Sequence, residues 1–496
     1  MALAACGEAA QDSAEPESES EPESLREVAE AAQTLIGTAV DARALAEDER
    51  YREVLVREFD YVTPENAMKW EPLAPSSDSY RWEEADAIVD FALEHELAIK
   101  GHTLIWHRQY PSWINALDEA ELSAATQRHI ETTMARYQGK IRAWDVVNEA
   151  VDIATDSGYT DSVFYRTLGP GYIADAFHWA RAADPEALLF YNEVGIERMG
   201  PKSEFTYQLM KDLLADGVPI DGIGLQSHVS THRYPSAQDL RENIRRFTEL
   251  GLIVNISEVD ARTVLMPGDR ASRWHMQRLA FQQITGACVL EGCEAVTFWG
   301  FTDRYSWIHD DSPEPDDPLL FDQEYQVKPA YQGVLDGLTG RMPREQDNQL
   351  ANGDFAGGDT SWSVTGGALE VSPADGREGN AACVSERTAP EDGIRQAELL
   401  TSLKGGGAFA FSAEVRVAGV PTATVEASLL VQEGDGEPET RSLATGPASD
   451  AGWTSLSGYL GLGFESEPGS SELVIHGPAA DVELCVADVQ LRPLAP

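Results

Sequence analysis

The sequence predicts an α/β fold, a (β/α)8 TIM barrel, followed by a smaller all-β domain of the jelly-roll or sandwich type. Three observations predict it. Strand-like and helix-like patterns alternate from Leu25 to Met342, several apolar runs stop at a polar residue, and the composition changes after Arg344. A doubly wound open sheet is the alternative, but no glycine-rich phosphate loop follows the first strand-like run.

The barrel is predicted from short apolar runs that are separated by longer stretches with helical spacing. The runs are Leu35–Val40, Tyr61–Met68, Ile99–Trp106, Ile141–Asn148, Leu188–Asn192, Ile220–His228, Leu252–Glu258 and Ala295–Trp299. Helical stretches between them include Trp82–Glu96, Leu122–Tyr137 and Ala237–Leu250. Eight such units over about 320 residues are typical of a closed parallel barrel.

Past Arg344, glycine, serine, threonine and alanine become frequent, and short alternating runs are separated by turn residues. The runs are Ala408–Val415, Thr424–Val431, Glu472–His476 and Val482–Leu491. This pattern predicts an antiparallel sandwich. We therefore divide the chain into an N-terminal segment over 1–24, a barrel over 25–344 and a sandwich over 345–496.

The charge balance excludes whole classes of partner. The chain carries 84 acidic and 37 basic residues, a formal net charge of -47, which argues against nucleic acid and anionic membrane surfaces. A uniformly acidic surface stays soluble where salt screens its self-repulsion, so we expect a saline environment. No apolar run approaches the ~20 residues of a transmembrane helix.

The N-terminal segment reads MALAACG, which resembles the end of a bacterial lipoprotein signal, in which the cysteine carries a lipid. The following residues, Glu8–Ser24, are acidic and include no basic residue, as in a solvated tether. We therefore expect a secreted protein that is anchored at the bacterial cell surface by a lipid on Cys6. The other cysteines fall into two groups, Cys288 with Cys293 and Cys383 with Cys485, which predicts two disulfides, with buried free thiols as the alternative.

Two glutamates stand out because each ends an apolar run: Glu149 in WDVVNEA and Glu258 in ISEVD. Glycoside hydrolysis needs such a pair of carboxyl groups. The ends of the other predicted strands supply hydrogen-bonding groups and tryptophans, which suit the hydroxyls and the C–H faces of a sugar chain. This set comprises Glu65, Asn66, Lys69, His102, Trp106, Asn148, Gln226, His228, Trp299 and Trp307.

With these motifs the sequence resembles glycoside hydrolase family 10, the retaining endo-β-1,4-xylanases. The matching segments are ENAMKW, GHTLIWH, WDVVNEA, YNE, QSH, SEVD and WGFTDRYSW, in the family's order. The resemblance implies that Glu149 is the acid/base, that Glu258 is the nucleophile, and that the ten residues above bind sugar. It also implies a short-range disulfide near Cys288 and Cys293.

The retaining route implied by the resemblance places two carboxyl groups ~5–5.5 Å apart, with Glu258 ionised and Glu149 protonated at the start. Strand alternation puts Glu258 and Asp260 on the same side, so we expect a carboxylate–histidine–carboxylate chain through His228. Departures from the family pattern include Arg108 and Glu193, which we expect at the rim, where a substituted chain would be held.

The C-terminal region resembles the family 4/9/22 group of carbohydrate-binding modules through NGDFAGG, SAEVRV and VADVQL. Its aromatic candidates for sugar binding are Trp362, Trp453, Tyr459 and Phe464, and a purely structural sandwich remains the alternative. Overall we expect a monomeric, retaining endo-β-1,4-xylanase that acts on xylan or xylo-oligosaccharides without a metal or cofactor. The alternatives are an endo-hydrolase that prefers β-1,4-glucan and an inactive polysaccharide-binding surface lipoprotein.

Overall fold

The computed structural model describes residues 24–266, 269–311, 315–399, 403, 406–434, 436–464 and 468–495. Cys6 and the acidic segment up to residue 23 lie outside the described residues. Among the helices of the described part, none has the length and apolar character needed to cross a bilayer.

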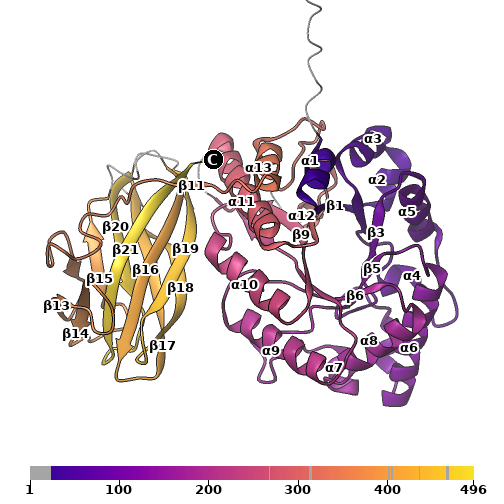
Figure 1. Cartoon of the computed structure of the whole chain (residues 1–496), viewed down its shortest axis with the longest axis horizontal. Helices are drawn as coiled ribbons and strands as arrows, with labels where there is room; N and C mark the ends of the chain where they lie inside the picture. The colour runs from indigo at the N-terminus through magenta and orange to yellow at the C-terminus, as the bar shows by residue number, and fades with distance from the viewer. Residues whose placement is uncertain are drawn as a thin grey trace, which may run out of the picture.

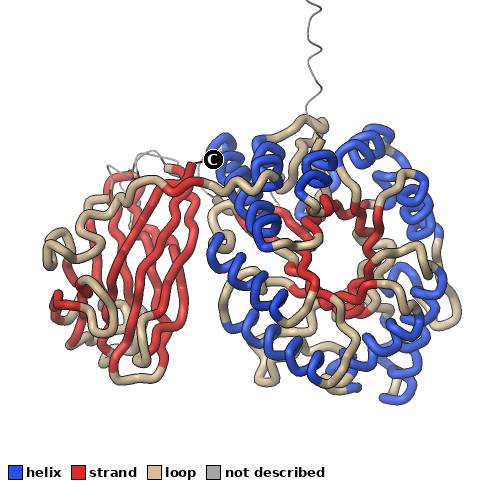
Figure 2. The backbone as a smooth tube through the Cα atoms, in the orientation of Figure 1, coloured by secondary structure: helices blue, strands red, loops and turns tan. Residues whose placement is uncertain are grey.

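Within the described residues, eight parallel strands close into a barrel, because β10 pairs with β1 on one side and with β9 on the other. The closed ring of strands is visible in Figure 2. Its strands are β1 (Leu35–Val40), β2 (Tyr61–Pro64), β3 (Ala98–Gly101), β5 (Ala143–Asn148), β6 (Leu188–Glu193), β7 (Gly222–Leu225), β9 (Ile253–Arg262) and β10 (Ala295–Phe298). The predicted TIM barrel is confirmed.

Helices surround the barrel as an outer layer (Figure 1). They are α1 (Leu25–Ala32), α2 (Ala42–Glu47), α3 (Glu49–Glu58), α4 (Trp70–Leu73), α5 (Glu83–Glu94), α6 (Glu119–Arg136), α7 (Val163–Leu168), α8 (Tyr172–Ala183), α9 (Pro201–Ala215), α10 (Ala237–Glu249), α11 (Arg270–Glu291), α12 (Ile308–Asp311) and α13 (Pro329–Leu338). Polar side chains cap the N-termini of several helices. Ser24 forms a capping box at the start of α1, and Asp118 forms one at the start of α6.

Two predicted runs are broken in the structure. The run Ile99–Trp106 becomes β3 and β4 (Ile105–Trp106), and the run Ile220–His228 becomes β7 and β8 (His228–Ser230). The second break falls at Gln226 and Ser227, and Ser227 has φ +64°. The backbone leaves the regular ladder where it turns polar side chains toward the mouth of the barrel.

The C-terminal part is a sandwich of two antiparallel sheets, as predicted. One six-stranded sheet has the order β13-β14-β21-β16-β19, with β11 also paired to β21, and a five-stranded sheet has the order β12-β15-β20-β17-β18. The strands are β11 (Arg344–Glu345), β12 (Ser363–Val364), β13 (Ala368–Pro373), β14 (Asn380–Ser385), β15 (Ile394–Ala397), β16 (Gly407–Ala418), β17 (Thr422–Glu433), β18 (Glu439–Ser449), β19 (Thr454–Leu462), β20 (Pro468–His476) and β21 (Glu483–Ala495).

The two predicted disulfides have different outcomes. Cys383 and Cys485 face each other across β14 and β21 and are joined. The pairing of Cys288 with Cys293 is wrong in this structure, since both are free and buried. Cys288 lies in the last turn of α11, and its thiol donates to the carbonyl oxygen of Ala295, 3.6 Å away. Burial raises the pKa of that thiol.

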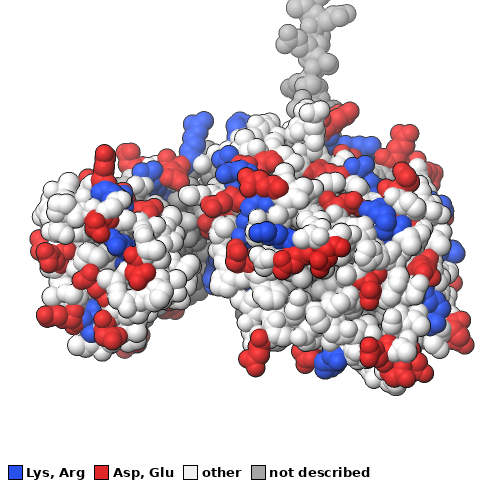
Figure 3. Space-filling view, turned by 60° about the horizontal axis from the view of Figure 1, so that its bottom comes forward, with Lys and Arg blue, Asp and Glu red and all other residues white. Residues whose placement is uncertain are grey.

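The sandwich packs directly against the barrel beside α10 and α11 (Figure 1). Tyr459 of β19 stacks on Tyr234, which precedes α10, with ring centroids 5.4 Å apart. Ala408, Ala410 and Leu494 of the sandwich belong to the same buried apolar cluster as the barrel core. Figure 3 shows acidic side chains spread over both parts on the face in view, with basic ones interspersed.

Candidate active site

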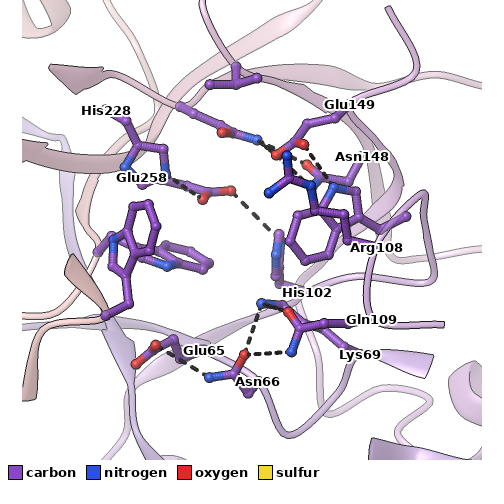
Figure 4. A pocket seen from close by; sticks show the side chains of 15 residues that line it. Glu65, Asn66, Lys69, His102, Arg108, Gln109, Asn148, Glu149, His228 and Glu258 are labelled. Atoms are coloured by element: carbon purple, nitrogen blue, oxygen red, sulfur yellow. Dashed lines mark hydrogen bonds and ion pairs between the residues drawn. The ribbon is translucent and has the colours of Figure 1, made fainter. Parts of the chain in front are cut away.

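A cavity of about 620 Å³ lies at the carboxyl ends of the barrel strands (Figure 4). All twelve site residues predicted from the sequence line it, together with Arg108, Gln109 and Val194, which were not in the predicted set. The predicted ones are Glu65, Asn66, Lys69, His102, Trp106, Asn148, Glu149, Gln226, His228, Glu258, Trp299 and Trp307.

Glu258 lies near the middle of β9 with only 4% of its surface exposed. Its Oε1 accepts a 2.6 Å hydrogen bond from Asn192 Nδ2, and its Oε2 accepts one of 3.1 Å from His228 Nε2. On the far side of the imidazole, His228 Nδ1 donates to Asp260 Oδ2 at 2.8 Å. The expected carboxylate–histidine–carboxylate chain is therefore present.

These contacts set the charge state of Glu258. Burial alone would raise its pKa, but the hydrogen bond from His228 and the positive charges of His102 and His228 outweigh burial and lower the pKa to about 2. For His228, burial acts to lower the pKa, and the charge and hydrogen bond of Asp260 raise it well above the ordinary value. An ionised Glu258 thus faces a protonated His228.

Glu149 follows directly after β5 and has φ +56°, a left-handed conformation that turns its side chain into the cavity. Trp106 Nε1 donates to its Oε2 at 2.8 Å, and Gln226 Nε2 donates to its Oε1 at 2.9 Å. His107 lies 3.8 Å from the same carboxylate, and burial lowers the pKa of that imidazole. Figure 4 shows the side chains of Glu149 and Glu258 reaching into the same cavity.

A network of amides links the two carboxylates. Asn192 Nδ2 donates both to Glu258 and, at 2.9 Å, to Asn148 Oδ1, which also accepts from Gln226 Nε2 at 3.2 Å. Ser257 Oγ donates to Asn192 Oδ1 at 2.6 Å and so fixes which way that amide points. These hydrogen bonds fix the positions of the two glutamates relative to each other.

The floor beneath Asn192 is made by a glycine. A Cβ atom at Gly224 would lie 2.1 Å from Asn192 Oδ1, so only glycine admits this side chain. The predicted set includes Asn148 and Gln226 but neither Asn192 nor Ser257. Each of them stands next to a glutamate, Asn192 near the end of β6 and Ser257 within β9, and this was the signal. Their hydrogen bonds across strands are not visible in the sequence.

Polar groups on the opposite wall hold one another in place. Lys69 Nζ donates to Asn66 Oδ1 at 3.0 Å and to Gln109 Oε1 at 2.8 Å, and it lies 4.7 Å from the centre of the Trp106 ring. Burial lowers the pKa of Lys69, while nearby glutamates, Glu258 foremost, oppose that effect. Lys69 is therefore held by two side-chain amides.

A fully buried ion pair supports the floor of the cavity. Lys100 Nζ lies 2.8 Å from Asp145 Oδ1, and His102 Nδ1 donates to Asp145 Oδ2 at 2.9 Å. The other face of His102 meets the edge of Trp299, with ring centroids 5.0 Å apart. Trp307 is fixed in turn, because its Nε1 donates to Asp260 Oδ2 at 2.8 Å.

The expectation that Glu193 lies at the rim is wrong. Glu193 is completely buried and pairs with Lys202 Nζ at 2.9 Å, and it accepts a 2.5 Å hydrogen bond from Tyr191. Burial raises its pKa to about 7 in spite of Lys202. Arg108, by contrast, does line the cavity.

The structure separates the aromatic candidates of the sandwich. Trp362 is buried in the sandwich core, and Phe464 packs against it. Tyr459 is covered by the barrel. Trp453 differs, because it lines a cavity of about 820 Å³ on the sandwich, together with polar side chains that include Arg377, Glu414 and Gln490.

Metal ligands are grouped closely at one place among the described residues, at Cys383, Glu483 and Cys485. The disulfide uses both thiols of this group, so it does not fit a metal ion. The cavity around Glu149 and Glu258 offers carboxylates, amides and indoles for a polar, ring-shaped ligand.

Two family models match the chain. The model of glycosyl hydrolase family 10 matches residues 24–337, and that of a carbohydrate binding domain matches residues 347–481. The chain is similar to endo-1,4-beta-xylanase B from Thermotoga neapolitana, with 40% identity over 313 residues, or 62% of this chain and 89% of that protein. It is also similar to endo-1,4-beta-xylanase D from Talaromyces funiculosus, with 39% identity over 305 residues, or 61% of this chain and 74% of that protein.

Solved structures give a parallel result. Native xylanase 10B from Thermotoga maritima is 41% identical, with a TM-score of 0.61, over 64% of this chain and 98% of that one. Xylanase 10B from Thermotoga petrophila RKU-1, solved in complex with xylobiose, is 39% identical, with a TM-score of 0.61, over 64% and 98%. The resemblances seen in the sequence are confirmed for both parts of the chain.

Proposed function

The chain belongs to glycosyl hydrolase family 10, and from this premise we propose that it cleaves internal β-1,4 linkages of xylan by a retaining double displacement at Glu149 and Glu258. The observation that carries the proposal is that the two carboxyl groups have different hydrogen-bond donors around them. Glu258 is buried yet keeps its charge through His228 and Asn192, whereas Glu149 faces it across the cavity with bonds from neutral donors.

In the first step a Glu258 oxygen attacks the anomeric carbon, and the bond from that carbon to the glycosidic oxygen breaks. The electron pair of the breaking bond goes to the glycosidic oxygen, which takes the proton of the Glu149 carboxyl. The product is a glycosyl ester on Glu258 and a free chain end. Asn148, which is fixed by Asn192 and Gln226, is placed to bond the 2-hydroxyl of the sugar.

In the second step Glu149, now a carboxylate, takes a proton from water as the water oxygen attacks the anomeric carbon. The ester bond breaks and its electron pair returns to Glu258, which regains its hydrogen bonds from His228 and Asn192. Two inversions at one carbon give net retention. Both glutamates end in their starting states.

The mechanism is tested by product stereochemistry and by rescue. We expect proton NMR of early xylohexaose products to show the β-anomer first, and azide to restore activity to Glu258→Ala on an aryl xylobioside as the α-azide. Glu149→Ala should keep activity only on aryl leaving groups that need no proton. Glu84→Ala, on the exposed face of α5, is the matched control. An α-anomer as first product would refute the retaining route.

The similarity of this chain to proteins named xylanases supports xylan, over β-1,4-glucan, as its substrate. The two polymers differ by the CH₂OH group of glucose, which the cavity wall around Glu65, Lys69 and Trp299 would have to admit. We expect reducing-sugar release from xylan to exceed release from cellulose oligosaccharides at least tenfold in kcat/KM, or about 1.4 kcal/mol. Equal rates would support the glucan alternative.

The sandwich is proposed to hold the enzyme on its polysaccharide, with Trp453 as the sugar platform. The match to a carbohydrate binding domain supports this role, as does the cavity that Trp453 lines. Binding there would raise the local concentration of substrate at the barrel. On an affinity gel that contains xylan, Trp453→Ala should migrate faster than the unmodified chain, while Trp362→Phe, a change in the sandwich core, should not. Equal mobility for Trp453→Ala and the unmodified chain would argue against the platform.

We also propose export, with a lipid on Cys6 as the anchor. The disulfide between Cys383 and Cys485 supports an oxidising compartment, where such bonds persist. Labelling with radioactive palmitate in a bacterial host should mark the protein, and Cys6→Ser should abolish the label while Cys293→Ser keeps it. Label retained in Cys6→Ser would rule out this anchor.

A further inference from the structure

Glu193 is a buried carboxyl group that the double displacement does not use. It ends β6, none of its surface is exposed, and it is not part of the lining of the catalytic cavity. The sequence departs from the family pattern at this residue. A buried carboxylate costs free energy unless hydrogen bonds compensate for the lost water, so the groups that bond to Glu193 indicate what it does.

Four donors surround the Glu193 carboxyl. Its Oε2 accepts a 2.5 Å hydrogen bond from Tyr191 Oη and one of 3.1 Å from the amide of Val151. Its Oε1 accepts one of 3.1 Å from the amide of Val194 and lies 2.9 Å from Lys202 Nζ. Only an ionised carboxylate can accept from all four, because a glutamine side chain has one oxygen and presents N–H donors on its other side.

The turn that carries Glu149 is held by β6. Three successive amide groups of this turn donate to three successive residues of the strand. These hydrogen bonds run from Glu149 N to Asn192 O at 2.9 Å, from Ala150 N to Tyr191 Oη at 3.2 Å and from Val151 N to Glu193 Oε2 at 3.1 Å. Glu193 controls two of the three, one directly and one by fixing the hydroxyl of Tyr191.

Glu149 needs this support because its backbone is left-handed, with φ +56°. A residue with a side chain keeps that conformation only where the surrounding structure holds it. On the other side of the turn, Thr160 donates its hydroxyl to Glu149 O and its amide to Ala150 O, both at 2.9 Å. Without Glu193 the turn is held mainly from the Thr160 side, so the Glu149 carboxyl is free to move away from the cavity.

We propose that Glu193 is the positioning residue of the acid/base: through Tyr191 and the amides of residues 150 and 151, it holds the Glu149 carboxyl where it meets the glycosidic oxygen. The inference rests on the proposed function. Lys202 offsets the buried charge of Glu193 and so keeps this acceptor ionised. Because Glu193 acts only through Glu149, its loss should slow only those steps in which Glu149 transfers a proton.

The test uses two substrates with the same sugar, phenyl xylobioside and 2,4-dinitrophenyl xylobioside, which differ in whether the departing oxygen needs a proton. The double variant Glu193→Gln/Lys202→Met removes the carboxylate together with its counter-charge, so that no unpaired charge is left behind. We expect its kcat/KM to fall about a hundredfold on the phenyl compound and to stay unchanged on the dinitrophenyl compound. The ratio kcat/KM reports formation of the glycosyl ester alone, without its later hydrolysis.

Tyr191→Phe is a second and milder variant, because it keeps the charges and removes one hydroxyl. It should lower kcat/KM about tenfold on the phenyl compound, again without effect on the dinitrophenyl compound. The matched control is Glu186→Gln/Lys211→Met, which changes an exposed glutamate in the loop before β6 and an exposed lysine of α9. This control should equal the unmodified chain on both substrates.

The outcomes separate this inference from the proposed function. If the unmodified chain fails to cut xylohexaose, the proposed function is wrong. If it cuts xylohexaose but the variants lose activity equally on the two aryl substrates, Glu193 supports only the fold and the inference is refuted. Variants that lose activity on neither substrate would refute it as well. If the double variant does not fold, the same comparison with Tyr191→Phe decides.

Discussion

Glu258 combines two properties that oppose each other, a buried position and a negative charge. Burial raises a carboxyl pKa, and the charge survives only because His228 and Asn192 donate to it directly. His228 can donate from both nitrogens because Asp260 keeps it protonated. The three side chains form one electrostatic unit, in which each member sets the state of the next.

The acid limb of activity should therefore depend on His228. In the unmodified chain Glu258 stays ionised as the pH falls to about 2, so kcat/KM should hold until the pH approaches that value. In His228→Ala the burial remains but the largest opposing contact is gone, so the pKa of Glu258 rises and the acid limb moves up by roughly one pH unit or more. A pH profile of kcat/KM on xylohexaose measures this. His178→Ala, at an exposed position on α8, is the control. If the acid limb of the pH profile stays in place in His228→Ala, His228 does not keep Glu258 ionised.

Single residues differ in how far the sequence reveals them. The link from Glu258 through His228 to Asp260 was predictable, because alternation along a strand fixes which side chains share a face. The burial of Glu193 was not, because its partner Lys202 lies on α9, and the approach of that helix to β6 is set by packing. Gln109 was missed for a similar reason, as its bond to Lys69 crosses between loops.

At the scale of elements, α11 and α13 approach closely through glycines. A Cβ atom at Gly333 of α13 would lie 2.2 Å from the carbonyl oxygen of Arg278, and one at Gly337 would lie 2.7 Å from that of Gln282. Both carbonyls belong to the backbone of α11, which cannot swing aside as a side chain does. The close contact of these two helices therefore depends on hydrogen atoms at both positions.

Gly333→Ala should lower the free energy of unfolding by about 1–3 kcal/mol, because the added methyl group must push the helices apart. Urea denaturation followed by circular dichroism measures the change. Gly171→Ala is the matched control, since this residue at the start of α8 has φ -60° and open space around its Cβ position, and it should change stability by less than about 1 kcal/mol. Equal effects of the two changes would contradict the packing argument.

The elements were easier to predict than their ends. The run Leu35–Val40 matches β1 because every residue from Ile36 on is buried, so apolar composition alone marks the strand. The runs that broke into β3 with β4 and β7 with β8 did so at polar residues such as His102 and Gln226. The spacing of apolar residues does not predict where the backbone bends to place a functional side chain in the cavity.

At the scale of the whole molecule, the composition indicated two parts but gave no sign that they dock. Tyr459, a candidate sugar platform in the sequence, stacks on Tyr234 of the barrel instead. Beside it, a Cβ atom at Gly461 would lie 2.8 Å from the carbonyl oxygen of Thr231 and 2.9 Å from Met276 Cε. The docked loop lies between His228 and α10 and carries Arg233, so the sandwich braces one wall of the pocket that adjoins the catalytic cavity.

Gly461→Val should therefore uncouple the two parts. The branched side chain cannot fit against Thr231, so we expect the sandwich to detach, a loss of about 1–3 kcal/mol, and thermal unfolding in a calorimeter to separate into two transitions. Gly452→Val places the same side chain in a turn of the sandwich with open space around it and should leave the trace unchanged. Identical traces for the two variants would mean that the docking contributes nothing to stability.

The net charge of -47 should make the stability of the molecule depend on salt. Acidic residues outnumber basic ones by 84 to 37, and their repulsion acts over a Debye length of about 10 Å at 0.1 M salt and about 3 Å at 1 M. The Tm should therefore rise between about 0.02 and 1 M NaCl, measured by scanning fluorimetry, and an uncharged solute at equal osmolality should raise it less. A Tm that is independent of NaCl would contradict the expectation of a saline environment.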